Sequence, residues 1–236
     1  MQKNKVSIII PTYNERDNVP IVFKAIDDVL DGKWHYQIIV VDDSSPDGTG
    51  MLVTELSDKD DRIKLIERPG KLGLGSAVVA GFDHSDGDYL VMMDADLSHD
   101  PKYLPDMLLE LSNHDIVIGS RYVDGGGVRN WPLWRRIVSL TASAVGRSIV
   151  GLNIRDITAG FAAFKRDHVM KLSSDLNPKG FKLLLEILAK SPRARIKECP
   201  IVFADRRFGR SKASFHEIIL FIQLCFQLRS VKKIYE

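Results

Sequence analysis

Residues 6–15 read Val-Ser-Ile-Ile-Ile-Pro-Thr-Tyr-Asn-Glu, a short apolar strand that ends in a polar turn. An amphipathic segment follows, and then a second Val- and Ile-rich run. The same alternation continues, with strands expected at 6–10, 37–41, 63–67, 89–93 and 115–119 and helices at 18–30, 48–57, 75–84 and 101–112. Strands that alternate with helices of this length indicate a mostly parallel sheet with helices on both faces. We therefore predict an α/β fold whose ligands bind beyond the carboxyl ends of the strands.

The second half of the chain has a different pattern. Residues 122–132 are rich in Gly and aromatic residues and are typical of a mobile loop. We expect helices at 133–150 and within 179–190, and one strand over 195–203. A last helix opens with a capping box, Ser214-x-x-Glu217, and has a wide apolar face. We divide the chain into a catalytic domain, residues 1–213, and a helix, residues 214–236. The helix either lies at a membrane interface, with Phe221, Phe226 and Leu228 among its lipid contacts, or packs against the catalytic core or a partner.

Composition limits the classes of function. The chain has 236 residues with 44% hydrophobic content, enough for one sizeable core. Its formal net charge of +2 argues against nucleic acid as a partner. Cys199 and Cys225 lack a paired spacing, and no Asn-x-Ser/Thr acceptor occurs, which favours a reducing, cytosolic location. No signal segment and no run long enough to span a membrane is apparent, so we expect a peripheral protein.

An acidic turn gives the strongest local chemical signal. It reads Met93-Asp94-Ala95-Asp96-Leu97-Ser98-His99 and follows an apolar strand. Carboxylates at i and i+2 can reach one divalent cation, and oxygen ligands suit Mg²⁺ or Mn²⁺ that bridge substrate phosphates. A lone pair of this kind is more often a solvated turn, so the interpretation depends on other motifs nearby.

Two further turns supply that support. Pro11-Thr12-Tyr13-Asn14-Glu15 follows the first strand, and Asp42-Asp43-Ser44-Ser45-Pro46-Asp47-Gly48 follows the second. Both place acids, hydroxyls or an aromatic ring where a nucleoside would bind in such a sheet. Asp42 is a natural acceptor for the donors of a base or ribose, whereas we interpret Asp47 as a helix N-cap.

Together these turns resemble the large inverting glycosyltransferase family with a GT-A fold. Further segments are similar to dolichyl- or polyprenyl-phosphate mannose synthases, and the similarity runs from about residue 6 to 228. They are Lys71-Leu72-Gly73-Leu74-Gly75, Gly119-Ser120-Arg121-Tyr122, Asn130-Trp131-Pro132-x-x-Arg135-Arg136 and Asp205-Arg206-x-x-Gly209-x-Ser211-Lys212.

The resemblance implies a role for each matching residue. The nucleoside would be held by Pro11, Tyr13, Glu15, Val40 and Asp42. The sugar, phosphates and metal would meet Asp94, Ala95 and Asp96. Donor phosphate would contact Arg121, Arg206 and Lys212, and lipid phosphate would contact Arg135 and Ser139. Ser98 stands where some relatives carry Gln as an additional metal ligand. It would be a weaker third ligand beside Asp94 and Asp96, and water would complete the coordination. Asp156 stands where relatives carry a similar acid and would orient the acceptor or an arginine.

The implied reaction moves mannose from GDP-mannose to dolichyl or polyprenyl phosphate with inversion, at the cytoplasmic face of a membrane. Asp94, Asp96, Arg121 and Arg135 would carry it. A UDP-glucose-dependent transferase to the same lipid is the nearest alternative. A sugar nucleotidyltransferase should have a Gly-rich, Arg-bearing loop after its first strand, and residues 11–15 differ from that. A non-catalytic membrane-associated subunit would have no reason to keep both acids of the turn. A membrane-anchor subunit stays open as a partner.

Overall fold

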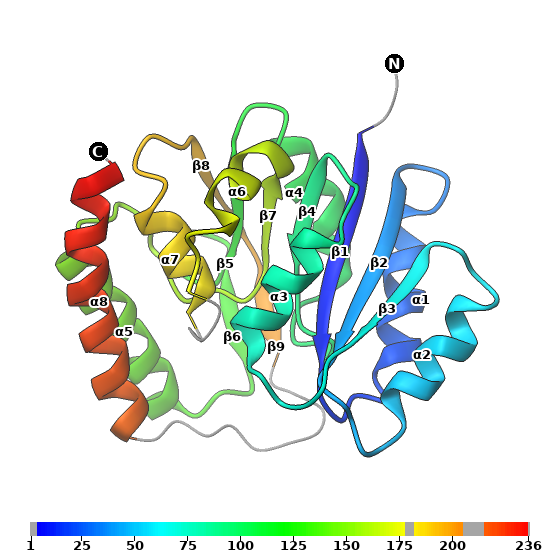
Figure 1. The fold of residues 1–236 in the computed structure, drawn as a ribbon. Coiled ribbons are helices and arrows are strands. Elements are labelled where there is room, and N and C mark those ends of the chain that lie inside the picture. Colours follow the sequence, from blue (N-terminus) through cyan, green and yellow to red (C-terminus); the bar gives the residue numbers. More distant parts are fainter. Residues whose placement is uncertain (1–3, 178–181, 205–214, 236) are drawn as a thin grey trace.

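The computed structural model describes residues 4–177, 182–204 and 215–235. Its main sheet has seven strands in the order β3-β2-β1-β4-β7-β5-β8 (Figure 1). Six of them run parallel, and β7 (Ala162–Lys165) is antiparallel to both of its neighbours. The predicted α/β class, with a mostly parallel sheet between helices, is confirmed.

The first half follows the sequence pattern closely. Its strands are β1 (Lys5–Thr12), β2 (His35–Asp42), β3 (Ile63–Glu67), β4 (Tyr89–Met92) and β5 (Ile116–Ser120). Its helices are α1 (Val19–Leu30), α2 (Thr49–Ser57), α3 (Leu74–Asp83), η1 (Pro101–Tyr103) and α4 (Leu104–Glu110). Short strands that feed directly into amphipathic helices leave little choice of topology.

Two apolar clusters cover the two faces of the sheet. Side chains alternate along β1, so Val6, Ile8 and Ile10 pack with α1 and α4, while Ile9 packs toward α3 on the other face. Because successive residues of β1 are buried, both faces of the strand are covered, as is usual for a parallel strand between layers of helices. The carboxyl ends of β1, β2 and β4 consequently lie at one edge of the sheet, where ligands bind in folds of this kind.

The second half holds four differences from the sequence prediction. The predicted strand at 195–203 is two strands, β8 (Ile196–Pro200) and β9 (Val202–Ala204), because the buried Ile201 lies where the chain changes sheets. The predicted loop contains β6 (Gly127–Arg129), which pairs with β9. The helix α6 (Arg166–Ser173) and the antiparallel β7 were not predicted. The helices α5 (Leu133–Val150) and α7 (Leu183–Ala189) were expected.

The last helix, α8 (Phe215–Tyr235), lies beside α5 (Figure 1). Three of its side chains, Phe221, Cys225 and Leu228, belong to the core of the molecule. A Cβ built at Gly146 of α5 would lie 2.8 Å from the Phe221 ring, so the glycine permits a close helix contact. Phe221 and Leu228 were expected to contact lipid from sequence; their burial at 5% and 3% exposure corrects that expectation. Phe226, the third expected contact, is 55% exposed.

No helix in the described part of the chain is both long enough and apolar enough to cross a bilayer.

Candidate active site

A pocket of about 260 Å³ lies at the carboxyl ends of β1, β2 and β4. Its size is near the lower end of small-molecule sites, which typically span about 300–1,000 Å³. Six residues predicted as donor contacts line it: Pro11, Tyr13, Glu15, Asp94, Ala95 and Asp96. The strands therefore bring the first turn and the acidic turn to one cavity, as the sequence predicts.

The acidic turn is tightly organised. Asp96 is 4% exposed, and its Oδ1 accepts hydrogen bonds from the backbone amide and the hydroxyl of Ser98. Leu97 between them has φ 61°, a left-handed conformation that is uncommon for a non-glycine residue and marks stored strain. Ser98 itself is 1% exposed and lies behind Asp96 rather than among the lining residues. The structure thus places the Ser98 hydroxyl as a donor to Asp96.

The buried His99 side chain holds the backbone of Asp94, the other acid of the turn. Its ring is 2% exposed and stacks on Phe161 with a centroid distance of 5.4 Å. The Asp94 backbone amide donates to His99 Nδ1 at 3.2 Å, so the ring proton is on Nε2. Burial lowers the pKa of His99 and outweighs the opposing attraction of Asp94 and Asp96. His99 is therefore a neutral acceptor that holds the Asp94 backbone.

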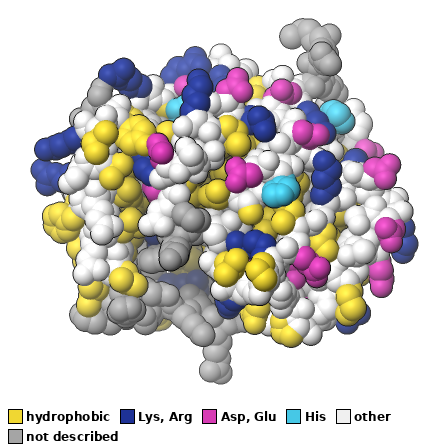
Figure 2. All heavy atoms as spheres, viewed as in Figure 1, with side chains coloured by type: hydrophobic (Ala, Val, Ile, Leu, Met, Phe, Trp, Pro, Cys, Tyr) yellow, Lys and Arg dark blue, Asp and Glu magenta, His cyan; other side chains and the backbone are white. Residues whose placement is uncertain are grey.

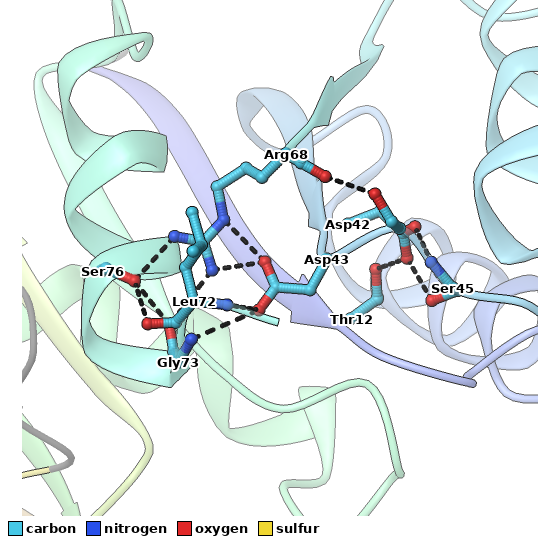
Figure 3. Close-up of polar contacts among 9 residues, drawn as sticks. Thr12, Asp42, Asp43, Ser45, Arg68, Leu72, Gly73 and Ser76 are labelled. Atoms are coloured by element: carbon cyan, nitrogen blue, oxygen red, sulfur yellow. Dashed lines mark hydrogen bonds and ion pairs between the residues drawn. The ribbon is translucent and has the colours of Figure 1, made fainter. Parts of the chain in front are cut away.

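The two acids at the end of β2, Asp42 and Asp43, have different hydrogen-bond partners (Figure 3). Asp42 is 1% exposed and accepts from Thr12 Oγ1 at 2.7 Å and from the amide and hydroxyl of Ser45. Asp43 lines the pocket. Asp42 is the last residue of β2 and Asp43 follows the strand, and the two carboxylates have different partners, Asp42 in Thr12 and Asp43 in the segment before α3. Asp42, predicted as a nucleoside contact, is buried and is not among the residues that line the pocket, and Val40 is fully buried in the core.

Arg121 is held by Asp156. Its Nε and Nη2 each donate to the Asp156 carboxylate at 2.7 Å, and Nη2 also donates to Thr158 Oγ1 at 3.0 Å. The Arg121 side chain is 9% exposed and that of Asp156 is fully buried. Asp156 orients Arg121, which is one of the two roles expected for it.

The predicted acceptor residues lie on α5 and the segment before it. The Arg135 guanidinium lies 4.1 Å from the centroid of the Trp131 ring, a cation–π distance. Ser139 accepts a hydrogen bond from the Tyr122 hydroxyl at 2.7 Å. Arg206 and Lys212 fall outside the described residues, as do residues 205–214 in general.

Several lining residues were not singled out from sequence as site residues: Thr12, Asp43, Lys71, Leu74 and Ala77. Lys71 could have been found from sequence, because it begins the segment Lys71–Gly75, which is similar to a segment of the mannose synthases. Within residues 4–177, 182–204 and 215–235, no group of three or more His, Cys, Asp or Glu side chains is arranged to hold a metal. A cation at Asp94 and Asp96 would need further oxygen ligands from a substrate or water.

The pocket is acidic and partly apolar, and it lies at the carboxyl ends of parallel strands. This fold and this pocket place the chain in the general class of α/β proteins that bind ligands at that edge of the sheet. Residues 7–173 match the model of the family described as Glycosyl transferase family 2. The chain therefore belongs to glycosyl transferase family 2.

Two curated relatives indicate which members of this family the chain resembles. The chain is 44% identical over 227 residues to the dolichol-phosphate mannosyltransferase of Pyrococcus furiosus, covering 95% of this chain and 63% of that protein. It is 43% identical over 221 residues to the polyprenol monophosphomannose synthase of Mycolicibacterium smegmatis, covering 88% of this chain and 80% of that protein. The chain thus spans a little under two thirds of the length of the first of these relatives.

Solved structures share the fold at low sequence identity. Glucosyl-3-phosphoglycerate synthase from Mycobacterium tuberculosis, in complex with Mn²⁺, UDP and glucosyl-3-phosphoglycerate, has a TM-score of 0.69 at 17% identity. That match covers 97% of this chain and 80% of the other. A mannosyltransferase from Pyrobaculum calidifontis, in complex with GDP-Man and Mn²⁺, has a TM-score of 0.62 at 16% identity and covers 98% and 74% of the two chains. These likenesses support the GT-A architecture.

Proposed function

We propose that this chain transfers mannose from GDP-mannose to a dolichyl or polyprenyl phosphate, giving the lipid-phosphate mannose and GDP. One observation carries the proposal: Tyr13, Glu15, Asp94 and Asp96 line a single pocket. The chain's relatives at 44% and 43% identity are named as a dolichol-phosphate mannosyltransferase and a polyprenol monophosphomannose synthase, which supports this choice of donor and acceptor.

The donor would enter the pocket with its nucleoside toward β1 and its diphosphate toward the acidic turn. Tyr13 is 38% exposed and offers a ring face, and Pro11 and Leu74 add apolar surface. Aromatic faces stack on planar bases with a gain of about 1–3 kcal/mol per base. Arg121, Arg206 and Lys212 are the proposed cationic contacts for the donor phosphates.

A divalent cation, Mg²⁺ or Mn²⁺, fits the chemistry of this donor set. Asp94 and Asp96 contribute hard oxygen ligands, and the Ser98 hydroxyl lies within hydrogen-bonding contact of Asp96. With only two carboxylates, the cation would complete its shell from diphosphate and water oxygens, as Mg²⁺ commonly does. When bound, it would neutralise charge that develops on the departing diphosphate.

The chemical step needs little proton transfer. A phosphate monoester has a second pKa near 6, so the acceptor oxygen is already anionic at neutral pH. That oxygen forms the new bond to the anomeric carbon while the bond from that carbon to the diphosphate breaks, and configuration inverts. Arg135 and Ser139 would orient the acceptor phosphate, so we assign no general base.

The lipid acceptor requires a membrane surface, and we propose a peripheral position on its cytoplasmic face. Exposed apolar side chains gather on α5 and α8, on the left side of the view in Figure 2. They include Leu133, Trp134, Ile137, Ile222 and Phe226, with Arg229 and Lys233 exposed near the end of α8. Residues 1–213 would carry catalysis, while α8 would serve both the core and this surface.

A two-donor assay tests the proposal. Purified chain, a polyprenyl phosphate in detergent and Mg²⁺ or Mn²⁺ are combined with radiolabelled GDP-mannose or UDP-glucose. We expect label to pass into the organic phase from GDP-mannose at a rate at least about a hundredfold above that from UDP-glucose, a difference of about 2.7 kcal/mol. Faster transfer from UDP-glucose would reject the donor, and no transfer from either would reject the function.

A further inference from the structure

We propose that Arg68 and Asp43 are positioning residues for donor binding. Their buried ion pair would fix residues 69–73, here called the strap, so that Lys71 stands at the pocket. The inference rests on the proposed function, because it states what the pair does for the nucleotide-sugar donor.

The pair joins the end of β2 to both ends of the strap. Arg68 Nε donates to Asp43 Oδ1 at 2.6 Å, and Arg68 Nη2 contacts the same oxygen. The second oxygen, Asp43 Oδ2, accepts from the backbone amides of Leu72 at 3.1 Å and Gly73 at 3.4 Å. One carboxylate therefore holds the arginine that precedes the strap and the amides with which the strap ends.

The Arg68 guanidinium also contacts the strap and the start of α3 directly (Figure 3). Arg68 Nη1 donates to Ser76 Oγ at 2.7 Å, and Nη2 donates to the Gly73 carbonyl at 3.1 Å. The Arg68 backbone is held as well, because its amide donates to the Asp42 carbonyl at 2.9 Å and its carbonyl accepts from the Ser44 hydroxyl. Side chain and backbone together tie β2, β3 and α3 at one point.

The strap needs such anchors because two of its five residues are glycines, and only Pro69 at its start restricts the backbone. Gly70 has φ 150° and Gly73 has φ 100°, and a Cβ at either position would meet no atom within 4 Å. Glycine here supplies conformational freedom rather than packing. The ordering of the segment therefore comes from contacts outside it.

Burial makes a purely stabilising role a poor explanation for the pair. The side chains of Arg68 and Asp43 are 9% and 7% exposed. Taking two charges out of water costs most of what their attraction returns, and an apolar pair of similar volume is often as stable. What the ion pair adds is fixed geometry, through hydrogen bonds that reach three different segments.

The fixed geometry of the strap places Lys71 at the pocket. Its Nζ lies 4.1 Å from the centroid of the Tyr13 ring, and both residues line the pocket. Among the described residues that line it, Lys71 is the one cation, facing the acids Glu15, Asp43, Asp94 and Asp96. A nucleoside diphosphate that enters this acidic surrounding would be attracted by a positioned ammonium.

Donor calorimetry and two-substrate kinetics test the inference with Arg68→Gln. We expect the Kd and the KM for GDP-mannose to rise about tenfold, less than for complete loss of a charge-assisted contact, because the Lys71 ammonium is still present but no longer held in place. The kcat and the KM for lipid phosphate should stay at the parent values. A general loss of structure would instead lower kcat and change both Michaelis constants.

A double-mutant cycle with Lys71→Ala is the sharper measurement. If Arg68 acts through Lys71, the combined variant should bind GDP-mannose no more weakly than Lys71→Ala alone. Additive losses would overturn the inference. Trypsin cleavage after Lys71 should be faster in Arg68→Gln than in the parent, which reports the strap without reference to activity.

Arg62→Gln is the matched control, because Arg62 precedes β3 as Arg68 follows it and is also paired with an aspartate, Asp60. It should leave donor binding unchanged. If Arg68→Gln does not fold, Ser76→Ala removes one anchor and should still raise the donor Kd; an unchanged Kd there rejects the inference. Failure of the parent chain to bind GDP-mannose would instead reject the proposed function.

Discussion

Arg121 and Asp156 meet through three hydrogen bonds, two from the guanidinium at 2.7 Å and one from the Arg121 amide at 3.0 Å. Burial disfavours the charged arginine, but its hydrogen bonds and attraction to Asp156 prevail and raise the pKa of Arg121. The rings of Tyr122, Trp131 and Phe203 surround the guanidinium at centroid distances of 5.0–5.7 Å. The cation is thus fixed in direction before any ligand arrives.

Asp156→Asn should strongly destabilise the protein, because it leaves the Arg121 charge buried without a counter-charge. We expect the free energy of unfolding, measured by urea denaturation, to fall by about 3–5 kcal/mol. Asp28→Asn, which breaks the exposed Lys24–Asp28 pair, is the control and should cost about 0.3–0.5 kcal/mol. Equal losses in the two variants would contradict the assigned role of Asp156.

Asp96→Asn and Asp94→Asn should each remove most transfer activity while the fold is kept, since one charge of the proposed cation site is lost. An amide oxygen at position 96 can still accept from Ser98, which is why stability should change little. Asp100→Asn, an acid of the same loop outside the pocket lining, is the control. Activity in excess EDTA equal to that with Mg²⁺ or Mn²⁺ would disprove the metal requirement.

Arg135→Ala should raise the KM for lipid phosphate or lower turnover, while affinity for GDP-mannose stays near the parent value. Loss of a charge-assisted phosphate contact costs about 2–3 kcal/mol, or roughly a hundredfold in rate. Arg206→Ala should instead weaken donor binding in calorimetry. Arg147→Ala, at the exposed far end of α5, should affect neither. If Arg135→Ala weakens donor binding as much as Arg206→Ala does, the division of the arginines is wrong.

Membrane attachment should depend on the exposed face of α5 and α8. Truncation after residue 213 is a poor test, because it would remove the core residues Phe221, Cys225 and Leu228. We expect the double variant Trp134→Glu/Phe226→Glu to float less with anionic liposomes and to unfold at the parent urea midpoint. Leu109→Glu is the control, since Leu109 is 63% exposed on α4 across the sheet. Equal flotation of both variants would reject the proposed surface.

Stability should fall as pH drops below about 6.5, because His99 and His168 are both held neutral by burial, which lowers the pKa of each. A lowered folded-state pKa means that the unfolded chain takes up protons first. The contribution is therefore complete above the unfolded pKa and is lost progressively below it. His168→Gln should reduce this decline in urea midpoints measured from pH 7.5 to 5, and an unchanged profile would count against it.

The first half of the fold was predictable because its signals are local. The β3 strand, for example, matches its predicted bounds. In the second half α5 does so too, because Pro132 precedes it and Gly151 ends it with φ 75°. The antiparallel β7 was not predictable, because its direction depends on pairing with strands far along the chain. The helix α6 was missed because only Val169 and Leu172 of its eight residues are buried.

The site was predictable as a set of turns but not as a set of side-chain directions. The sequence predicted the turn after β2 near the site and Asp42 as its contact, yet only the three-dimensional structure shows that Asp43 lines the pocket and that Asp42 binds Thr12. The place of Lys71 beside Tyr13 could not be predicted from sequence, because it depends on the conformation of the strap, which Arg68 holds through contacts with residues further along the chain. Residues 94–96 were found because strand and turn are contiguous.

The antiparallel strand β7 separates β4 from β5 in the sheet by a fixed distance. Ala162 of β7 pairs with Met92 of β4 on one side and with Ile118 of β5 on the other. Two interstrand steps of about 4.8 Å each therefore separate the strand that leads to Asp94 from the strand that leads to Arg121. The acid turn and the fixed guanidinium are held apart by backbone hydrogen bonds, so substitutions among the surrounding side chains can alter specificity without changing the span between them.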